Sequence, residues 1–503
     1  MSLRALNSPL SVPRNVVTVI IGCVWILMMG HLVKTEIHIQ KDRTDKTFVT
    51  SPIIRPFNQW MEIFYKGEKL GYSHTDLTQM DREGETMFSL SHRTQLKMKV
   101  LDVTQNIKMS GFSFFDAEAR LKNFTFYVDT KSYKMVLKGE MHDQVLSVHL
   151  KTGQSEQSFD LNVPENIIFS EDMNFLMTQK KFRPGDHGQF IVFDPIAMGQ
   201  YALTYDVLEK KDGLLKIEFN YRGLLSYVWL NEHREIVKEI NPLGWVMIRS
   251  TREDALSDMP GNLDLTSATS IPVTKEIPNP QNIKKLTLVI KGIDAGVLRD
   301  FPPKEIQNID VIRKLSGIEI IITKPGENDL EILREIEEHD EEAMSVYLKG
   351  EILIQTQHPL IVSTAHEIVD TDLDLWGAAK KINEWVFDTL EKKPVISIPS
   401  ALDVLKSGYG DCNEHTVLFT ALARAKGIPV IPIVGLVFLD NKFYYHAWPA
   451  VYIGEWIQMD PTFGQNIADT THIPFFAGSL EEQARIASLV GRIQIEVIDI
   501  VNE

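Results

Sequence analysis

Apolar and polar residues alternate between Trp60 and about Ser250, and this pattern constrains the fold more than any other feature of the chain. Runs such as Phe124, Phe126 and Val128 place an apolar side chain at every second position, the period of a β-strand with one buried face. Turn-forming stretches such as KKDG at 210–213 separate these runs. The pattern predicts a large antiparallel sheet, which we interpret as a binding or spacer domain because it contains no catalytic or metal-binding pattern.

The segment from Asn15 to Val33 is almost wholly apolar and contains no Asp, Glu, Lys or Arg. At a rise of about 1.5 Å per residue, a helix of this length just crosses a bilayer. Arg4 and Arg14 precede it, so the positive-inside rule favours a cytoplasmic N-terminus. We therefore predict a single-pass protein of the cell membrane, anchored by this helix, with the rest of the chain in the periplasm. A cleaved signal peptide and a helix of another kind are the alternatives.

A change of composition marks a boundary at 257–282, where four prolines and few large apolar residues are typical of a linker. Beyond it, two further strands are predicted, at 284–292 and 317–325, and a helix with apolar residues at three- and four-residue spacing is predicted at 376–390. The predicted fold class is α+β. The predicted division is a cytoplasmic tail with a signal-anchor helix at 1–40, a β-rich domain at 50–256, the linker at 257–282, a strand-rich connecting segment at 283–350 and a C-terminal domain at 351–503.

The chain carries 52 basic and 68 acidic residues, a net charge of -16. Such a charge repels nucleic acid unless a local basic patch intervenes, and no such patch is apparent in the sequence. We therefore exclude nucleic acid as a partner.

The chain has two cysteines, Cys23 in the apolar segment and Cys412, so the predicted exported part cannot form an internal disulfide. Cys412 lies in SGYGDCNEHTVLFTALARAKGIP at 407–429, where Asp411 and Glu414 have the spacing of a capping box before an apolar run. Cys412 would then begin a helix.

At the first position of a helix, the macrodipole favours the thiolate of Cys412 and should lower the thiol pKa below its free value of about 8.5. The two carboxylates in the same turn oppose this effect. Gly408 and Gly410 are expected to leave space beside the sulfur for a substrate. The alternative interpretation is a small core residue kept for packing.

The stretch NKFYYHAWPAVYIGEWIQMDPTFG at 441–464 predicts two strands joined by a turn near Gly454. His446 and Asp460 lie on opposite arms at nearly equal distances from Ile453. In an antiparallel ladder with that register, or one shifted by two residues, their side chains share a face. A carboxylate beside an imidazole fixes its tautomer and stabilises its protonated form.

The region from about Leu375 to Gln465 closely resembles the transglutaminase-like superfamily, of a bacterial membrane-anchored type, whose core has a papain-like arrangement. GYGDCNEHTVLFTALARAKGIP is similar to the nucleophile motif of the family, and HAWPAVYIGEWIQMDPTFG is similar to its histidine and aspartate motifs. The resemblance implies that Cys412 is the nucleophile, His446 the general base and acid, and Asp460 the orienting carboxylate.

The resemblance also implies acyl chemistry, in which Cys412 attacks an amide of a protein or peptide and the acyl thioester passes to an amine or to water. The amide N–H of Cys412 is a plausible oxyanion donor, whereas Trp385 is expected to be a core residue. The predicted function is therefore a membrane-anchored cysteine acyltransferase, amidohydrolase or peptidase. The alternative is a non-catalytic binding or scaffold protein. No cofactor or metal is predicted, because the histidines lack a metal-ligand spacing, and the ligand of the β-rich domain is unknown.

Overall fold

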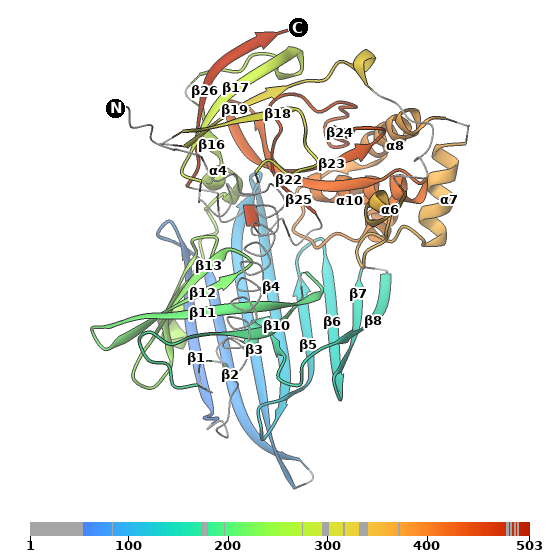
Figure 1. Cartoon of the computed structure of the whole chain (residues 1–503). Coiled ribbons are helices and arrows are strands. Elements are labelled where there is room, and N and C mark those ends of the chain that lie inside the picture. Colours follow the sequence, from blue (N-terminus) through green and yellow to red (C-terminus); the bar gives the residue numbers. More distant parts are fainter. Residues whose placement is uncertain are drawn as a thin grey trace, which may run out of the picture. The chain divides into compact units, whose positions relative to one another are not determined.

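The computed structural model in Figure 1 describes residues 54–503. The described part excludes 83, 154, 173–174, 176, 178–179, 196, 274, 294–300, 315–316, 331–340, 371–372, 479–481, 483–484, 487–488 and 490–491. Residues Pro52–Glu503 form one compact unit.

One 15-stranded sheet takes up most of the first half of the chain. Its strands follow the order β8 to β1 and then β15 to β9, so that consecutive strands are neighbours almost throughout. All neighbouring pairs are antiparallel except β9 with β10. The strands are β1 (Phe57–Tyr65), β2 (Glu68–Arg82), β3 (Glu85–Val100), β4 (Val103–Asp116), β5 (Leu121–Asp129), β6 (Lys134–His142), β7 (Val145–Thr152), β8 (Ser155–Asn162), β9 (Ile168–Phe169), β10 (His187–Asp194), β11 (Gly199–Lys211), β12 (Leu214–Tyr221), β13 (Leu224–Leu230), β14 (Ile236–Ile240) and β15 (Val246–Ser250).

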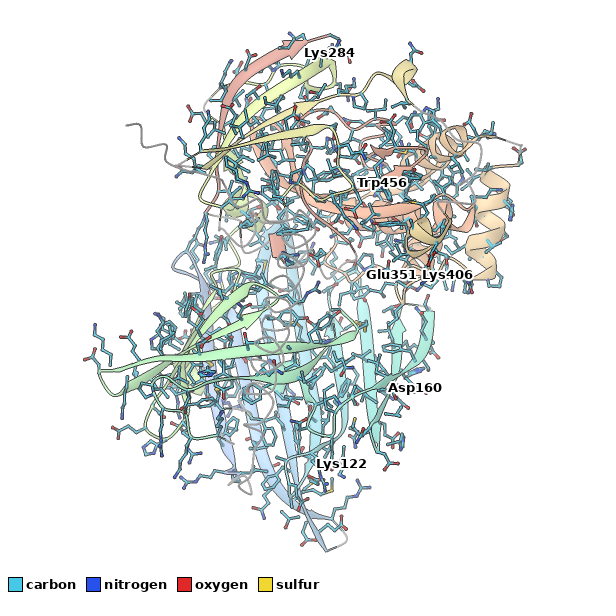
Figure 2. All side chains as sticks on the ribbon, viewed as in Figure 1. Lys122, Asp160, Lys284, Glu351, Lys406 and Trp456 are labelled. Carbon is cyan, nitrogen blue, oxygen red and sulfur yellow. The ribbon has the colours of Figure 1, made fainter. Side chains whose placement is uncertain are left out.

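The large sheet curls over its own apolar face. Phe124 of β5 stacks on Phe169 of β9 with ring centroids 4.4 Å apart, and lies 5.5 Å from Phe193 of β10. Strands at opposite ends of the sheet order therefore enclose a common core, and β10 to β13 cross in front of the first strands in Figure 1. Polar side chains such as Lys122 and Asp160 point outward (Figure 2).

The second half of the chain forms two smaller sheets, a two-stranded pair of β20 with β21, and most of the helices. One sheet has the order β16, β23, β22, β25, with β24 paired to β23, and the other has the order β18, β19, β17, β26. The strands are β16 (Ile271–Pro272), β17 (Ile283–Lys291), β18 (Ile309–Lys314), β19 (Gly317–Thr323), β20 (Glu391–Lys392), β21 (Tyr409–Gly410), β22 (Val430–Leu439), β23 (Lys442–Tyr452), β24 (Trp456–Gln458), β25 (Ile473–Ala477) and β26 (Gln494–Asn502), and the helices are α3 (Arg252–Ala255), α4 (Leu265–Thr269), α6 (Glu341–Met344), α7 (Pro359–Ile368), α8 (Leu375–Thr389), α9 (Ala401–Ser407) and α10 (Cys412–Ala425).

The β22–β23 sheet is buried on both faces. One face packs with α7, α8 and α10 in a core that includes Val451, Ile453 and Met459. The other packs against the β17–β19 sheet in a core that includes Trp448. The helix predicted at 376–390 is confirmed as α8, whose buried side includes Trp376, Ala379, Ile382 and Val386.

The predicted fold class, α+β with an N-terminal transmembrane helix, is wrong. Strands predominate, and among the described residues helices of eight residues or more are limited to α7, α8 and α10. No helix in this part of the chain is long and apolar enough to span a membrane, and the predicted span from Asn15 to Val33 lies outside it. The class was misjudged because the sheet from 57 to 250 and the two smaller sheets outweigh the helices of the C-terminal part.

The stretch predicted as a linker, 257–282, is packed against the rest of the chain. Leu263 accepts a backbone hydrogen bond from Lys99 of β3, and Ile271 of β16 pairs with Phe443 of β23. Ile271 and Ile277 are both buried. The division into the domains predicted from the sequence, including this boundary, stays a prediction.

Gly435 of β22 is the ladder partner of His446. It lies where β22, β25 and the ring of Trp448 pack closely together. A Cβ on Gly435 would lie 2.0 Å from the carbonyl oxygen of Ile473 and 2.7 Å from the Trp448 ring. We expect Gly435→Ala to lower the free energy of unfolding by about 2 kcal/mol through overpacking. Urea unfolding measures this.

Gly111→Ala is the matched control, because a Cβ there meets its nearest neighbour at an ordinary 3.8 Å. Equal losses in the two variants would contradict the steric explanation.

Candidate active site

The helix that carries Cys412 begins as the sequence predicts. Asp411 is the N-cap residue of α10 and accepts a hydrogen bond from the Asn413 N–H, while the Asp411 N–H donates to the Glu414 carboxylate at 3.0 Å. This capping box confirms the helix start and makes Cys412 the first helical residue.

The two glycines before Cys412 have different roles from the expected one. Gly408 has a φ of 70° and ends α9 in the left-handed region, which favours glycine. A Cβ on Gly410 would lie 2.1 Å from the Cβ of Glu414, so Gly410 makes room for the capping carboxylate. The space at Gly410 is therefore taken by the side chain of Glu414, whereas a Cβ on Gly408 would meet no atom within 4 Å.

The hairpin predicted around Gly454 is present, with β23 paired to β24. Its register pairs Ala450 with Gln458, which is shifted by two residues from equal spacing about Ile453. His446 Nε2–H donates to the Asp460 carboxylate over 2.7 Å, and both side chains are buried. With the proton on Nε2, the Nδ1 lone pair of a neutral His446 is available as a base.

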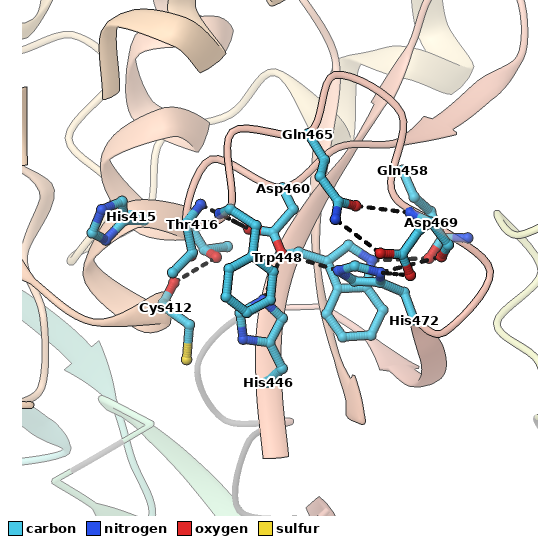
Figure 3. A network of polar contacts seen from close by, with 12 residues as sticks. Cys412, His415, Thr416, His446, Trp448, Gln458, Asp460, Gln465, Asp469 and His472 are labelled. Carbon is cyan, nitrogen blue, oxygen red and sulfur yellow. Dashed lines mark hydrogen bonds and ion pairs between the residues drawn. The ribbon is translucent and has the colours of Figure 1, made fainter. Parts of the chain in front are cut away.

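Cys412 and His446 come together although they lie on different elements. The backbone of Ala447, next to His446 in β23, lies near enough to the Cys412 sulfur to lower the pKa of the thiol. Figure 3 shows the sulfur beside the His446 imidazole. The ring of Phe463 stacks on this imidazole, with centroids 4.9 Å apart and planes inclined by 12°, which restricts the rotation of His446.

Asp460 is fully buried and accepts four hydrogen bonds. His446 and His472 donate to the same oxygen, over 2.7 and 3.0 Å, and the backbone N–H groups of Thr462 and Phe463 donate to the other. Burial alone would raise the pKa of Asp460, but the two imidazoles outweigh it and hold this pKa well below the usual range. Asp460 is therefore ionised at neutral pH.

His472 is a second histidine on the same carboxylate (Figure 3). Its Nδ1 faces Asp469 at 3.3 Å, so the ring lies between two carboxylates. Burial would lower the pKa of His472, but the hydrogen bonds to Asp460 and Asp469 raise it to about 10. The ring is therefore a cation at neutral pH and neutralises part of the buried charge.

The environment of the Cys412 thiol differs from the expected one. Burial raises the pKa of the thiol well above its ordinary value, and the neighbouring carboxylate of Asp411 raises it further, whereas the Ala447 N–H has a smaller opposing effect. The expected low pKa was wrong because the helix dipole competes with desolvation and with nearby acids. The resting group is a thiol, and its ionisation requires a nearby base.

A strap at 395–400 connects the large sheet to this helix. Thr130 and Tyr133, at the β5–β6 turn, donate side-chain hydrogen bonds to the carbonyls of Ile396 and Ile398. Between these two, Ser397 donates to the carboxylate of Glu414. Alternate residues of the strap therefore contact the sheet and the capping box of Cys412.

His446, Asp460 and His472 are also the described residues that could hold a metal ion. Their ligand atoms lie within 4.8 Å of one another. The two imidazole nitrogens already donate to the carboxylate, so a metal would have to replace both hydrogen bonds.

The match to known families covers this site. Residues 362–461 match the family model of the transglutaminase-like superfamily. This part of the chain is therefore similar to the transglutaminase-like superfamily. The match runs from α7 to the residue after Asp460, and so includes Cys412 and His446. No curated protein matches the chain in sequence.

Two solved structures resemble this chain weakly. One is a candidate cysteine protease from Cytophaga hutchinsonii, 16% identical, covering 44% of this chain and 86% of its own, with a TM-score of 0.28. The other is a candidate protease from Parabacteroides distasonis, 10% identical, covering 79% of this chain and 70% of its own, with a TM-score of 0.20. Neither likeness is strong enough to carry an argument about this chain.

The sequence analysis missed His472, Asp469 and Phe463. His472 was considered only as a metal ligand and set aside. These residues follow Asp460 in a loop without a regular period, and their contacts depend on how that loop folds back. Trp385, by contrast, packs in the helical core as expected.

The two-sided ion pairing of His472 predicts a pH-dependent contribution to stability. The pKa of His472 is raised in the folded protein, so its stabilisation is complete below the unfolded pKa of about 6.5 and is lost as the pH rises through about 10. We expect His472→Gln to lower the free energy of unfolding by on the order of 3 kcal/mol near pH 6.5. Urea unfolding between pH 6 and 10, roughly the window of this linkage, measures it.

The difference between the protein and this variant should shrink steadily toward pH 10. His187→Gln, at an exposed position, is the control and should show no such trend. A pH-independent difference would mean that His472 is neutral in the folded state.

Proposed function

We propose that this transglutaminase-like protein is a cysteine enzyme that cleaves or transfers acyl groups at amide bonds of proteins or peptides. The observation that carries the proposal is the position of the Cys412 sulfur beside the imidazole of His446 (Figure 3), a histidine already oriented by Asp460. A packing role for Cys412 does not account for a buried imidazole with its Nδ1 left available as a base.

In the first step, Cys412 transfers its proton to Nδ1 of His446 and the sulfur attacks the carbonyl carbon of the amide. The imidazolium that forms is stabilised by the ionised Asp460 at 2.7 Å. The N–H of Cys412, at the start of α10, is suited to stabilise the oxyanion.

In the second step, the C–N bond breaks and the leaving amine takes the proton from His446. The acyl group remains as a thioester on Cys412. A water molecule or a second amine then gives a proton to His446 and attacks the thioester carbonyl, which restores the thiol. Hydrolysis and acyl transfer differ only in this acceptor.

The raised thiol pKa favours this general-base route over a stored thiolate. Because burial and Asp411 disfavour the negative charge, the thiolate forms only as the proton moves to His446. Loss of the base should therefore cost far more activity than in an enzyme with a preformed thiolate.

In the test, the protein is incubated with amide-containing peptides and the reaction is quenched with acid. Mass spectrometry of the protein fragment that contains Cys412 then detects any acyl group. We expect an acyl adduct on Cys412 and none in Cys412→Ala. His446→Ala should slow acylation by about 10³-fold or more, and Asp460→Asn by about 10²-fold to 10⁴-fold.

Cys23→Ala, which removes the other cysteine of the chain, is the matched control and should acylate normally. Unchanged turnover in Cys412→Ala, or a Cys412 that accepts no acyl group from any peptide amide, would favour the non-catalytic binding or scaffold function instead.

A further inference from the structure

The large sheet carries a hollow of about 510 Å³ on the outer surface of β3 to β6. The register places Arg93, Ser110 and Tyr127 in one row across these strands, and Lys108, Asp129 and Lys134 in the next. Directly opposed residues share a face of the sheet. This face is the reverse of the one that carries the buried Phe124 and Phe126.

The hollow is positively charged in an otherwise acidic chain. Arg93, Lys108 and Lys134 are exposed, and none of them forms an ion pair with a described carboxylate. Among the described residues, Asp129 is the one acidic residue that lines the hollow, which leaves an excess of two positive charges. The sequence does not reveal this patch because its members come from three separate strands.

The spacing of the cations selects an extended ligand with several negative groups. Lys108 and Lys134 are two strands apart, which separates their Cβ atoms by about 10 Å, and Arg93 is a diagonal neighbour of Lys108 at about 7 to 8 Å. One small anion cannot contact all three. Carboxylates on every second or third residue of an extended peptide lie about 7 to 10 Å apart, which matches this pattern.

Two exposed aromatic residues provide an apolar contact in the same hollow. Phe112 and Tyr127 are each 38% exposed, and their rings meet edge to face with centroids 6.5 Å apart. An apolar side chain between the acidic ones of a peptide can pack against them.

The hollow also leads toward the catalytic helix. Lys134 lines a second hollow, of about 210 Å³, together with Tyr409 and Glu414. These two residues flank Cys412 in the sequence, and Glu414 belongs to the capping box that begins α10. A peptide bound on the sheet therefore lies next to the part of the protein that holds the nucleophile.

We infer that the outer face of β3 to β6 binds an acidic, extended segment of a polypeptide substrate. The role as a substrate site rests on the proposed function, but the binding itself does not. Arg93, Lys108 and Lys134 pair with its carboxylates, and Phe112 and Tyr127 contact an apolar residue between them.

The experiment measures fluorescence anisotropy of a labelled peptide of about twelve residues, with glutamate at alternate positions and leucine near its centre. The full chain with Cys412→Ala is titrated, so that no reaction occurs. We expect Lys108→Glu and Arg93→Glu each to raise Kd by about tenfold or more, and binding to weaken between about 0.05 and 0.5 M salt. Phe112→Ser should also weaken binding, but this loss should depend less on salt than the losses caused by the two charge changes.

Lys285→Glu is the matched control, since it makes the same charge change at an exposed position of β17. Its neighbour Lys284 is labelled in Figure 2. A peptide with glutamine in place of glutamate should bind at least about tenfold more weakly. Equal binding of both peptides, equal effects of Lys285→Glu and Lys108→Glu, or preference for an anionic polysaccharide over the acidic peptide would overturn the inference.

Binding in Cys412→Ala without any acylation in the unmodified protein would preserve the site and reject the proposed enzyme. Acylation at the same rate for acidic and neutral peptides would support the proposed enzyme and reject the outer face of β3 to β6 as its substrate site.

Discussion

The buried carboxylate of Asp460 is the interaction on which the candidate site depends. A fully buried negative charge is costly unless it is paired and hydrogen-bonded, and here two imidazoles and two backbone N–H groups satisfy it. The same contacts fold the loop after Asp460 back on itself and fix the orientation of His446. A thiol can transfer its proton to this imidazole only from a position next to it. The first residue of α10, Cys412, places a thiol there (Figure 3).

The electrostatics of the helix start favour a protonated thiol at Cys412. The capping box gives α10 a defined first turn, yet it brings the carboxylates of Asp411 and Glu414 next to Cys412. Burial also raises the pKa of Asp411, with Glu414 as the second cause. Stability of the helix start and acidity of the thiol therefore oppose each other, and in the proposed mechanism His446 is the base that ionises the thiol.

The large sheet contributes to this site through few but specific contacts. The strap at 395–400 joins the β5–β6 turn to Glu414, and Asp403 of α9 accepts hydrogen bonds from Thr152 and Ser155 of β7 and β8. The sheet thus supports the segments that precede Cys412, while its outer face gathers three cations that form no ion pair with a described carboxylate. Both features arise because a β-sheet brings residues from distant parts of the chain into adjacent rows.

Local patterns in the sequence were sufficient to predict several features. Alternation predicted the strands between Trp60 and about Ser250, the spacing of Asp411 and Glu414 predicted the start of α10, and Gly454 predicted the hairpin that carries His446. Each of these features depends on interactions within a few residues or on one repeating period. Such interactions can be recognised from the order of residues alone.

Only the tertiary structure decided the remaining features, because they depend on contacts between distant segments. The strong predominance of strands, the role of His472 beside Asp460 and the steric need for Gly435 could not be read from local spacing. The raised pKa of the Cys412 thiol is the clearest case. The sequence by itself determined that a cysteine begins a helix, and the tertiary structure decided its charge, since burial and the positions of neighbouring carboxylates set that charge.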